Sequence, residues 1–198
     1  NSMRLNDPLV NDLQIGSRIF KLDLSFDNVL DILDILNDFD LEEFEKLDLI
    51  CDLLVEYEVS DDHLVEDFEL TFEEQTEIYL YARNNYIDIG EETFIERDIL
   101  GEPMPNASEK TIDFKLDAKF IYASFFALGI NLFDQQGKLT WMEFQALLNA
   151  LPDDSIMSKI IQIRTWQPKG GESQDYLDEM NKLQKKYSLN QEEGDVDG

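Results

Sequence analysis

IDFKLDAKFIYASFFALGINLFDQQGKLTWMEFQALLNALPDDSIMSKIIQIRT occupies residues 112–165 and contains three successive helix patterns. The first, over residues 114–128, is apolar around most of its circumference, so we expect it in the centre of a core. Gly129 can end that helix. A second helix is predicted over 140–150, where a proline follows, and a third over 153–166. This stretch therefore predicts a helical fold.

Two glycines and a proline follow the third helix and predict a hinge. Pro168, Gly170 and Gly171 lie within four residues of one another. Ser173 then has the position of an N-cap for a last amphipathic helix that ends near Tyr187. Beyond it the chain is polar and acidic, so we expect residues 189–198 to be a disordered tail.

The N-terminal part of the chain carries a mixed pattern. Residues 14–22, QIGSRIFKL, predict a short β-hairpin or an extended lead-in. Residues 25–36 alternate apolar and acidic side chains at helical spacing and predict an amphipathic helix. Asp40 is a candidate cap for the next helix, and the short connection favours a helical hairpin. The inner stripe of this second helix is predicted to contain Leu41, Phe44, Leu47, Ile50, Cys51 and Leu54.

A capping box marks the next helix. Thr71 and Glu74 have the required spacing, and the helix that they begin is expected to run to about Asn84. There an Asn84-Asn85 pair should break it. Residues 88–111 then lose the helical period and contain glycines and prolines, which indicates a mostly irregular connector.

Taken together, these patterns predict a mainly α protein, a helical bundle to which a short N-terminal β-hairpin is added. We expect an acidic helical region over 1–87 and a connector over 88–111. A C-terminal helical region over 112–188 is expected to pack on the first, and a disordered tail over 189–198 completes the chain.

The net charge restricts the partners. Lys and Arg total 16 against 44 Asp and Glu, so the formal charge is −28. Such a chain repels phosphate backbones and anionic lipid surfaces, and we expect no direct binding to nucleic acid or membrane. With this many carboxylates, close acidic pairs arise by chance and nominate no active site, so we expect no enzyme activity and no cofactor.

The single cysteine and the single histidine lie in unpromising settings for catalysis. Cys51 is in the apolar run LDLICDLLV and is interpreted as a buried thiol. His63 lies in the acidic run SDDHLVED, where a solvated side chain is the ordinary outcome. The lack of a disulfide framework, of a long apolar run and of a basic-then-apolar N-terminus leads us to expect a cytoplasmic protein.

A calcium loop is suggested by Asp134, Gly137 and Glu143, which resemble the second half of an EF-hand. If Gly137 is the sixth loop position and Glu143 the twelfth, the first position falls on Leu132, which cannot bind a cation. We therefore expect no metal site. The alternative interpretation is a turn with Gly137 in the left-handed conformation, followed by Thr140 as a helix cap.

Arg164 ends an otherwise apolar helix. A cation at that position complements the helix dipole, and its guanidinium can pair with a carboxylate from elsewhere in the chain. We interpret it first as part of a structural ion pair and second as a partner contact.

Several blocks of the sequence resemble a known family. The blocks IDFKLDAKFIYASFFALGINL, GKLTWMEFQALLNALPDDSIMSKIIQIR and the terminal KKY, with the N-terminal FKLDLSFDNVLDILDILNDFDLEEFEKLDLICDLLV, resemble the bacteriophage "gene product fifteen" family of tail-module proteins. Phages and prophages of Gram-positive bacteria encode this family, typically between the major tail protein and the tape-measure protein.

The resemblance implies a role in tail assembly, without catalysis, in the cytoplasm of the bacterial host. That gene position is the one of tail-assembly chaperones, so the tape-measure protein is the favoured partner and another tail protein the alternative. A soluble helical protein could cover the apolar stripes of a long helical chain. We expect the contacts at Trp141, Phe144, Arg164 and Trp166, although the N-terminal helical hairpin could equally form the groove. Association of the chain with itself stays open.

Two alternatives remain from the sequence. The charge and the carboxylates along the first two helices would suit a DNA mimic that inhibits a host DNA-binding protein. The EF-hand-like turn would suit a calcium-regulated binding module, which a calcium titration tests.

Overall fold

The computed structural model describes residues 11–60, 63–87 and 111–189 and divides the chain into two compact units. The first unit comprises Asn1–Thr93 and Phe133–Leu147, and the second comprises Phe94–Leu132 and Leu148–Gly198. The connector predicted over 88–111 and the tail predicted over 189–198 lie outside the described residues, apart from Thr111 and Leu189.

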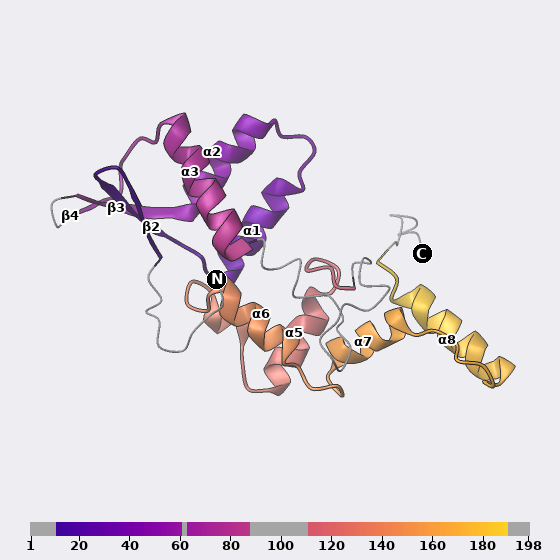
Figure 1. The fold of residues 1–198 in the computed structure, drawn as a ribbon. Coiled ribbons are helices and arrows are strands. Elements are labelled where there is room, and N and C mark those ends of the chain that lie inside the picture. Colours follow the sequence, from indigo (N-terminus) through magenta and orange to yellow (C-terminus); the bar gives the residue numbers. More distant parts are fainter. Residues whose placement is uncertain (1–10, 61–62, 88–110, 190–198) are drawn as a thin grey trace, which may run out of the picture. The chain divides into compact units, whose positions relative to one another are not determined.

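A four-stranded antiparallel sheet lies in the first unit (Figure 1), which also contains α1 (Phe26–Leu36), α2 (Glu43–Leu54) and α3 (Phe72–Ala82). Its strands are β1 (Asp12–Ile15), β2 (Arg18–Leu22), β3 (Val55–Ser60) and β4 (His63–Val65), in the order β1-β2-β3-β4. Gly16 has φ of 59° in the turn between β1 and β2. The hairpin predicted within residues 14–22 is therefore confirmed, but it is one half of a larger sheet.

The sequence contains a pattern that accounts for the additional strand β3. Residues 55–60, VEYEVS, alternate apolar and acidic side chains, which is the period of a strand. β3 follows α2 directly and pairs with β2, Ile19 facing Val59 and Lys21 facing Tyr57. A prediction of helices joined to one hairpin misses this strand because Leu54 ends the helical stripe only one residue before the strand begins.

Three helices accompany the sheet: α1 (Phe26–Leu36), α2 (Glu43–Leu54) and α3 (Phe72–Ala82). The capping box of α3, formed by Thr71 and Glu74, is confirmed. The predicted cap of α2 is wrong, because Glu42 and not Asp40 occupies the N-cap and exchanges capping-box bonds with Glu45. The predicted break at Asn84-Asn85 is also wrong, since the chain continues as a π-helix over Arg83–Ile87.

The core of the first unit recruits a segment from later in the sequence. Trp141 donates its backbone N–H to the Leu24 carbonyl over 2.8 Å, and Phe26 donates to the Leu139 carbonyl over 2.9 Å. The rings of Phe26 and Phe144 stack with centroids 5.0 Å apart. These contacts place the first part of α6 (Trp141–Asn149) and the residues just before it against the start of α1.

The second unit contains α5 (Ala118–Ala127), α7 (Ile156–Thr165) and α8 (Gln174–Lys186). α5 packs against α7, and α7 packs against α8. Ser155 and Ser173 cap α7 and α8, and the cap predicted at Ser173 is confirmed. α5 buries Ile121 and Phe125 but exposes Phe126, so the prediction of a helix surrounded by core is wrong: one face is buried and the other is not.

Candidate functional site

The two predicted contact residues on α6 are buried in the first unit. Trp141 is 2% exposed and Phe144 is 1% exposed, and their rings stack with centroids 5.5 Å apart. Their surface is used within the fold, against Phe26 and the segment that precedes α1. The rings therefore offer almost no area to a partner.

The other two predicted contact residues lie in the second unit, at the junction of α7 and α8. Arg164 donates two hydrogen bonds of 2.7 Å to the carboxylate of Asp117, which is 1% exposed. It also donates to the carbonyls of Thr111 and Tyr187. The rings of Trp166 and Tyr176 pack in a T shape, with centroids 5.8 Å apart. Arg164 thus forms a structural ion pair, which is the first of the two interpretations predicted from the sequence. It joins the start of α5 to the end of α8.

The turn that resembles an EF-hand is held by contacts within the protein. Gly137 has φ of 67°, as predicted, and its N–H donates to Asp27 over 2.9 Å. The carboxylate of Glu143 accepts from both the N–H and the hydroxyl of Thr140, while the Glu143 N–H donates back to that hydroxyl. In residues 11–60, 63–87 and 111–189, no three His, Cys, Asp or Glu side chains are grouped as a metal site would require.

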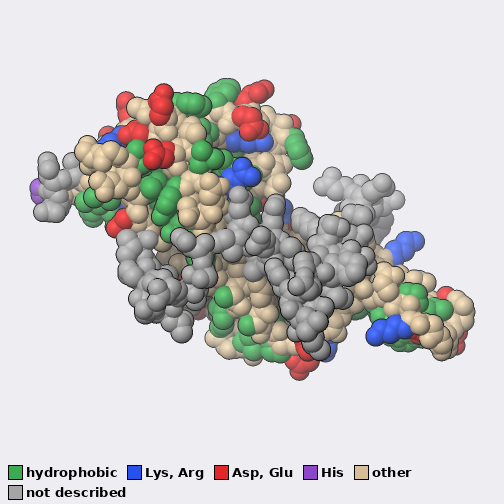
Figure 2. Space-filling view, in the orientation of Figure 1, with side chains coloured by type: hydrophobic (Ala, Val, Ile, Leu, Met, Phe, Trp, Pro, Cys, Tyr) green, Lys and Arg blue, Asp and Glu red, His purple; other side chains and the backbone are tan. Residues whose placement is uncertain are grey.

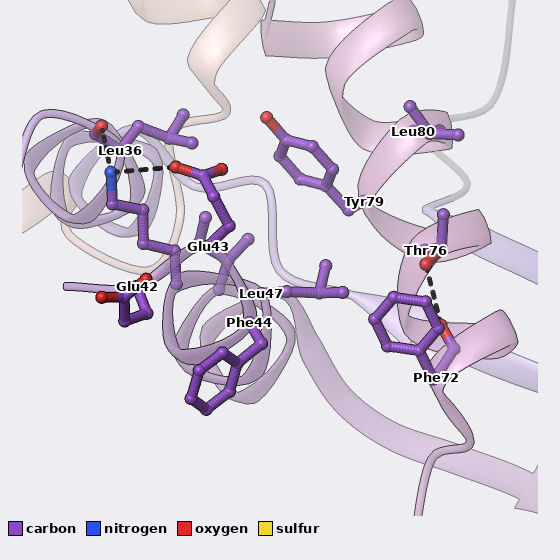
Figure 3. A pocket seen from close by; sticks show the side chains of 11 residues that line it. Leu36, Glu42, Glu43, Phe44, Leu47, Phe72, Thr76, Tyr79 and Leu80 are labelled. Atoms are coloured by element: carbon purple, nitrogen blue, oxygen red, sulfur yellow. Dashed lines mark hydrogen bonds and ion pairs between the residues drawn. The ribbon is translucent and has the colours of Figure 1, made fainter.

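A groove with a volume of about 500 Å³ lies between α2 and α3, and Leu36, the last residue of α1, also lines it. Figure 3 shows the side chains of Leu47 and Phe72 projecting into the gap from opposite helices. Its lining is mainly apolar, and the principal apolar side chains are Leu36, Phe44, Leu47, Phe72, Tyr79 and Leu80.

Several large apolar side chains of this groove are open to solvent. Phe44 is 63% exposed, Phe72 is 64% exposed and Leu80 is 44% exposed. Large apolar side chains rarely gather at a water-exposed surface without a use, because each forfeits the free energy of burial. The prediction that Phe44 belongs to the inner stripe of α2 is therefore corrected. The core is served by Ile50, Cys51 and Leu54.

The rim of the groove is acidic. Glu42 and Glu43 line it, together with one cation, Lys46. The ammonium of Lys46 lies 3.4 Å from the Leu36 carbonyl and 3.6 Å from the Glu43 carboxylate. In Figure 2 the region that carries α1, α2 and α3 shows Asp and Glu side chains interspersed with hydrophobic ones.

Arg18 fixes the end of α3 that carries Phe72. Its guanidinium donates to Glu58 on β3, to Glu74 in the first turn of α3 and to the Glu69 carbonyl just before it. The guanidinium carbon also lies 4.8 Å from the ring centroid of Phe20. This single side chain therefore joins the sheet to the start of α3 and holds one wall of the groove in place.

The same cluster lowers the pKa of two carboxyl groups. The hydrogen bond from Arg18 is the largest cause of the lowered pKa of Glu58, and burial opposes it. For Glu74 the largest cause of the lowered pKa is the N–H of Thr71, to which Arg18 adds. The pKa of Arg18 is raised by its bond to Glu58, so the guanidinium stays charged.

The sequence contains a signal for this groove that the prediction did not use. The α3 sequence FEEQTEIYLYA needs only Ile78 and Ala82 for its buried face, yet it also carries Phe72, Tyr79 and Leu80. An amphipathic helix with more large apolar residues than its core face requires predicts a second apolar face. On α2, Phe44 is likewise a large apolar residue that lies outside the buried face of its helix.

Comparison with protein families identifies the chain. Residues 5–189 match the model of the family described as Bacteriophage Gp15 protein, and the chain belongs to this family. It is therefore a bacteriophage protein of a structural or tail-related kind. A search of the curated proteins and a search of the solved structures both returned no match. Across the part of the chain that the structure describes, no helix has the length and hydrophobicity to cross a membrane.

Proposed function

We propose that this protein is a non-enzymatic tail-assembly chaperone, which binds the tape-measure protein or another tail protein in the cytoplasm of the host. The observation that carries the proposal is the groove between α2 and α3 with its exposed Phe44, Phe72 and Leu80, in a member of the Gp15 family. A chaperone of this kind needs an apolar surface that is available before the tail tube forms.

The charge of the chain supports the same function. An apolar groove exposes a protein to self-association, and a net charge of −28 counteracts this by keeping copies apart. The same charge would keep a complex with a long apolar-striped chain in solution. A binding surface and a solubilising surface are thus combined in one small protein.

Co-expression tests the proposal. The tape-measure protein of the same phage is produced with and without the tagged chain, and its soluble fraction and co-purification are measured. The proposal predicts a complex and a larger soluble fraction of the tape-measure protein in the presence of the chain. If neither the tape-measure protein nor any other tail protein of that phage co-purifies, the proposal is wrong, and basic host proteins become the partners to test.

A further inference from the structure

The groove between α2 and α3 also indicates what kind of segment fills it. We propose that it receives one amphipathic helix of the partner, with large apolar residues at i, i+3 or i+4, and i+7 on one face and Lys or Arg on the flanks of that face. This inference rests on the proposed function, because it names the chemistry of the segment that the tail protein contributes.

The shape of the groove selects a helix. Two helices form its long walls, and the exposed rings of Phe44 and Phe72 come from opposite walls. A helix laid along such a channel presents its apolar residues in one row and satisfies its own backbone hydrogen bonds, so no polar main-chain group is buried without a partner. Apolar burial at Phe44, Phe72 and Leu80 would supply most of the affinity.

Charge complementarity selects basic flanks. Lys46 is the only Lys or Arg in the sequence between Asp38 and Ala82, and its ammonium already lies beside Glu43 and the Leu36 carbonyl. Glu42 and Glu43 line the rim beside it, and Asp38 and Asp40 are exposed in the loop that precedes α2. An acidic segment would be repelled here, whereas Lys or Arg beside the apolar row would be attracted and would accelerate association.

The basic amphipathic helix of this chain itself is not the occupant. α8 carries Lys182, Lys185 and Lys186, but its apolar face is used within the second unit, where Met180 is 9% exposed. Gln184 also donates to the carbonyls of Ile163 and Trp166, which anchors α8 to the end of α7. A second copy seated groove to groove would bring two acidic rims together, which like charges oppose.

Labelled peptides test the inference without requiring the natural partner. Two model helices share one apolar row of leucines and differ in their flanks, which are Lys in one and Glu in the other. Binding to the full chain is followed by fluorescence anisotropy. We expect the Lys-flanked peptide to bind with an affinity that weakens as salt is added, and the Glu-flanked peptide to bind at least about tenfold more weakly.

Substitutions then locate the binding site. Phe44→Ser and Phe72→Ser should each weaken binding of the Lys-flanked peptide by about tenfold, because an exposed anchor is lost. The matched control is Phe126→Ser on α5, where the ring is 58% exposed but lies in the second unit, and it should leave binding unchanged. Circular dichroism confirms that each variant folds, and Leu80→Ser replaces any that does not.

Three results would overturn the inference: no binding of the Lys-flanked peptide, equal loss with Phe126→Ser, or a dimer in sedimentation that Phe44→Ser disperses. The third result would make a second copy the occupant. These failures differ from failure of the proposed function. If the wild type and Phe72→Ser keep the tape-measure protein soluble equally well, the groove is not the binding site, but the chaperone function stands. If the chain binds the peptide but no tail protein, the groove binds helices, but the proposed chaperone function is wrong.

Discussion

Asp117 is among the most deeply buried charged side chains in the described part of the protein, and Arg164 is the reason that it is tolerated. The guanidinium of Arg164 balances the charge of the carboxylate and donates two hydrogen bonds of 2.7 Å to it, and the Asp113 N–H donates a third. A buried carboxylate without its partner is costly because it has lost its hydration. The pair fixes the start of α5 to the end of α7 and, through the Tyr187 carbonyl, to the end of α8.

Removal of the guanidinium should therefore destabilise the second unit. We expect Arg164→Leu to lower the free energy of unfolding by about 3 to 5 kcal/mol, since Asp117 is left buried and unpaired. Urea titration followed by circular dichroism measures this. The double variant Arg164→Leu with Asp117→Leu should recover part of the loss. A loss below about 1 kcal/mol in the single variant would contradict the role assigned to the pair.

Cys51 offers a second test at this scale. Burial is the largest cause that raises the pKa of its thiol to about 12, and the charges of Asp52 and Asp48 add to it. The side chain is 1% exposed. At about pH 8 the folded protein should react with Ellman's reagent at least about a hundredfold more slowly than the chain in urea. Rapid reaction of the folded protein would show that the first unit opens far more readily than its packing implies.

The start of α3 shows how one element depends on another. Arg18 on β2 donates to Glu58 and Glu74, and the pKa of each carboxyl group is lowered from its usual value of 4.5. A carboxyl group whose folded pKa lies below its unfolded pKa binds fewer protons in the folded state. Its contribution to stability is therefore present above about pH 4.5 and is lost as the pH falls through the lowered folded pKa.

The pH dependence of unfolding checks this cluster. We expect the thermal midpoint of the wild-type chain to fall between about pH 5 and about pH 3, and to fall less steeply in Arg18→Met, because that variant lacks the bonds that lower the pKa of Glu58. Arg18→Lys, which keeps one charge without the paired bonds, should be intermediate. Parallel curves for the wild type and Arg18→Met would show that the cluster does not contribute.

The cap of α3 makes a separate prediction. Thr71→Ala removes the side chain that accepts from the Glu74 N–H and should cost about 1 kcal/mol of stability. Because Phe72 is the first residue of α3, fraying there should also weaken binding of the Lys-flanked peptide. Ser173→Ala, the equivalent change at α8, is the control and should lower stability without changing peptide binding. Equal effects of both variants on binding would contradict the position of the groove.

At the level of elements, the sequence predicted what depends on local chemistry. The turn at Gly137, the capping box at Thr71 and the cap at Ser173 are each set by residues within three positions, and each is confirmed. The period of strand β3 is readable in the sequence, but its pairing with β2 is not, because the pair joins Val59 to Ile19 across forty residues of sequence. Such a pairing depends on tertiary contacts that periodicity cannot show.

For the molecule as a whole, the sequence pattern could not predict that residues 133–147 belong to the first unit. Phe26 and Phe144 are apolar residues of two clearly predicted helices. No residue near either of them in the sequence indicates that their rings stack on each other. The groove shows the opposite case, in which a residue that fits the predicted buried stripe is exposed. Phe44 satisfies the helical stripe of α2 yet is exposed, because α2 packs against α1 and α3 with Ile50 and Leu54 instead.

Co-expression with the tape-measure protein is the most direct measurement for the molecule as a whole, carried out with the wild-type chain, with Phe44→Ser plus Phe72→Ser, and with Phe126→Ser. We expect the wild type and Phe126→Ser to retain the tape-measure protein in the soluble fraction, and the double variant to lose it. Rescue by all three chains would place the contact outside the groove. Rescue by none, with every chain folded and no other tail protein co-purifying, would contradict the chaperone function itself.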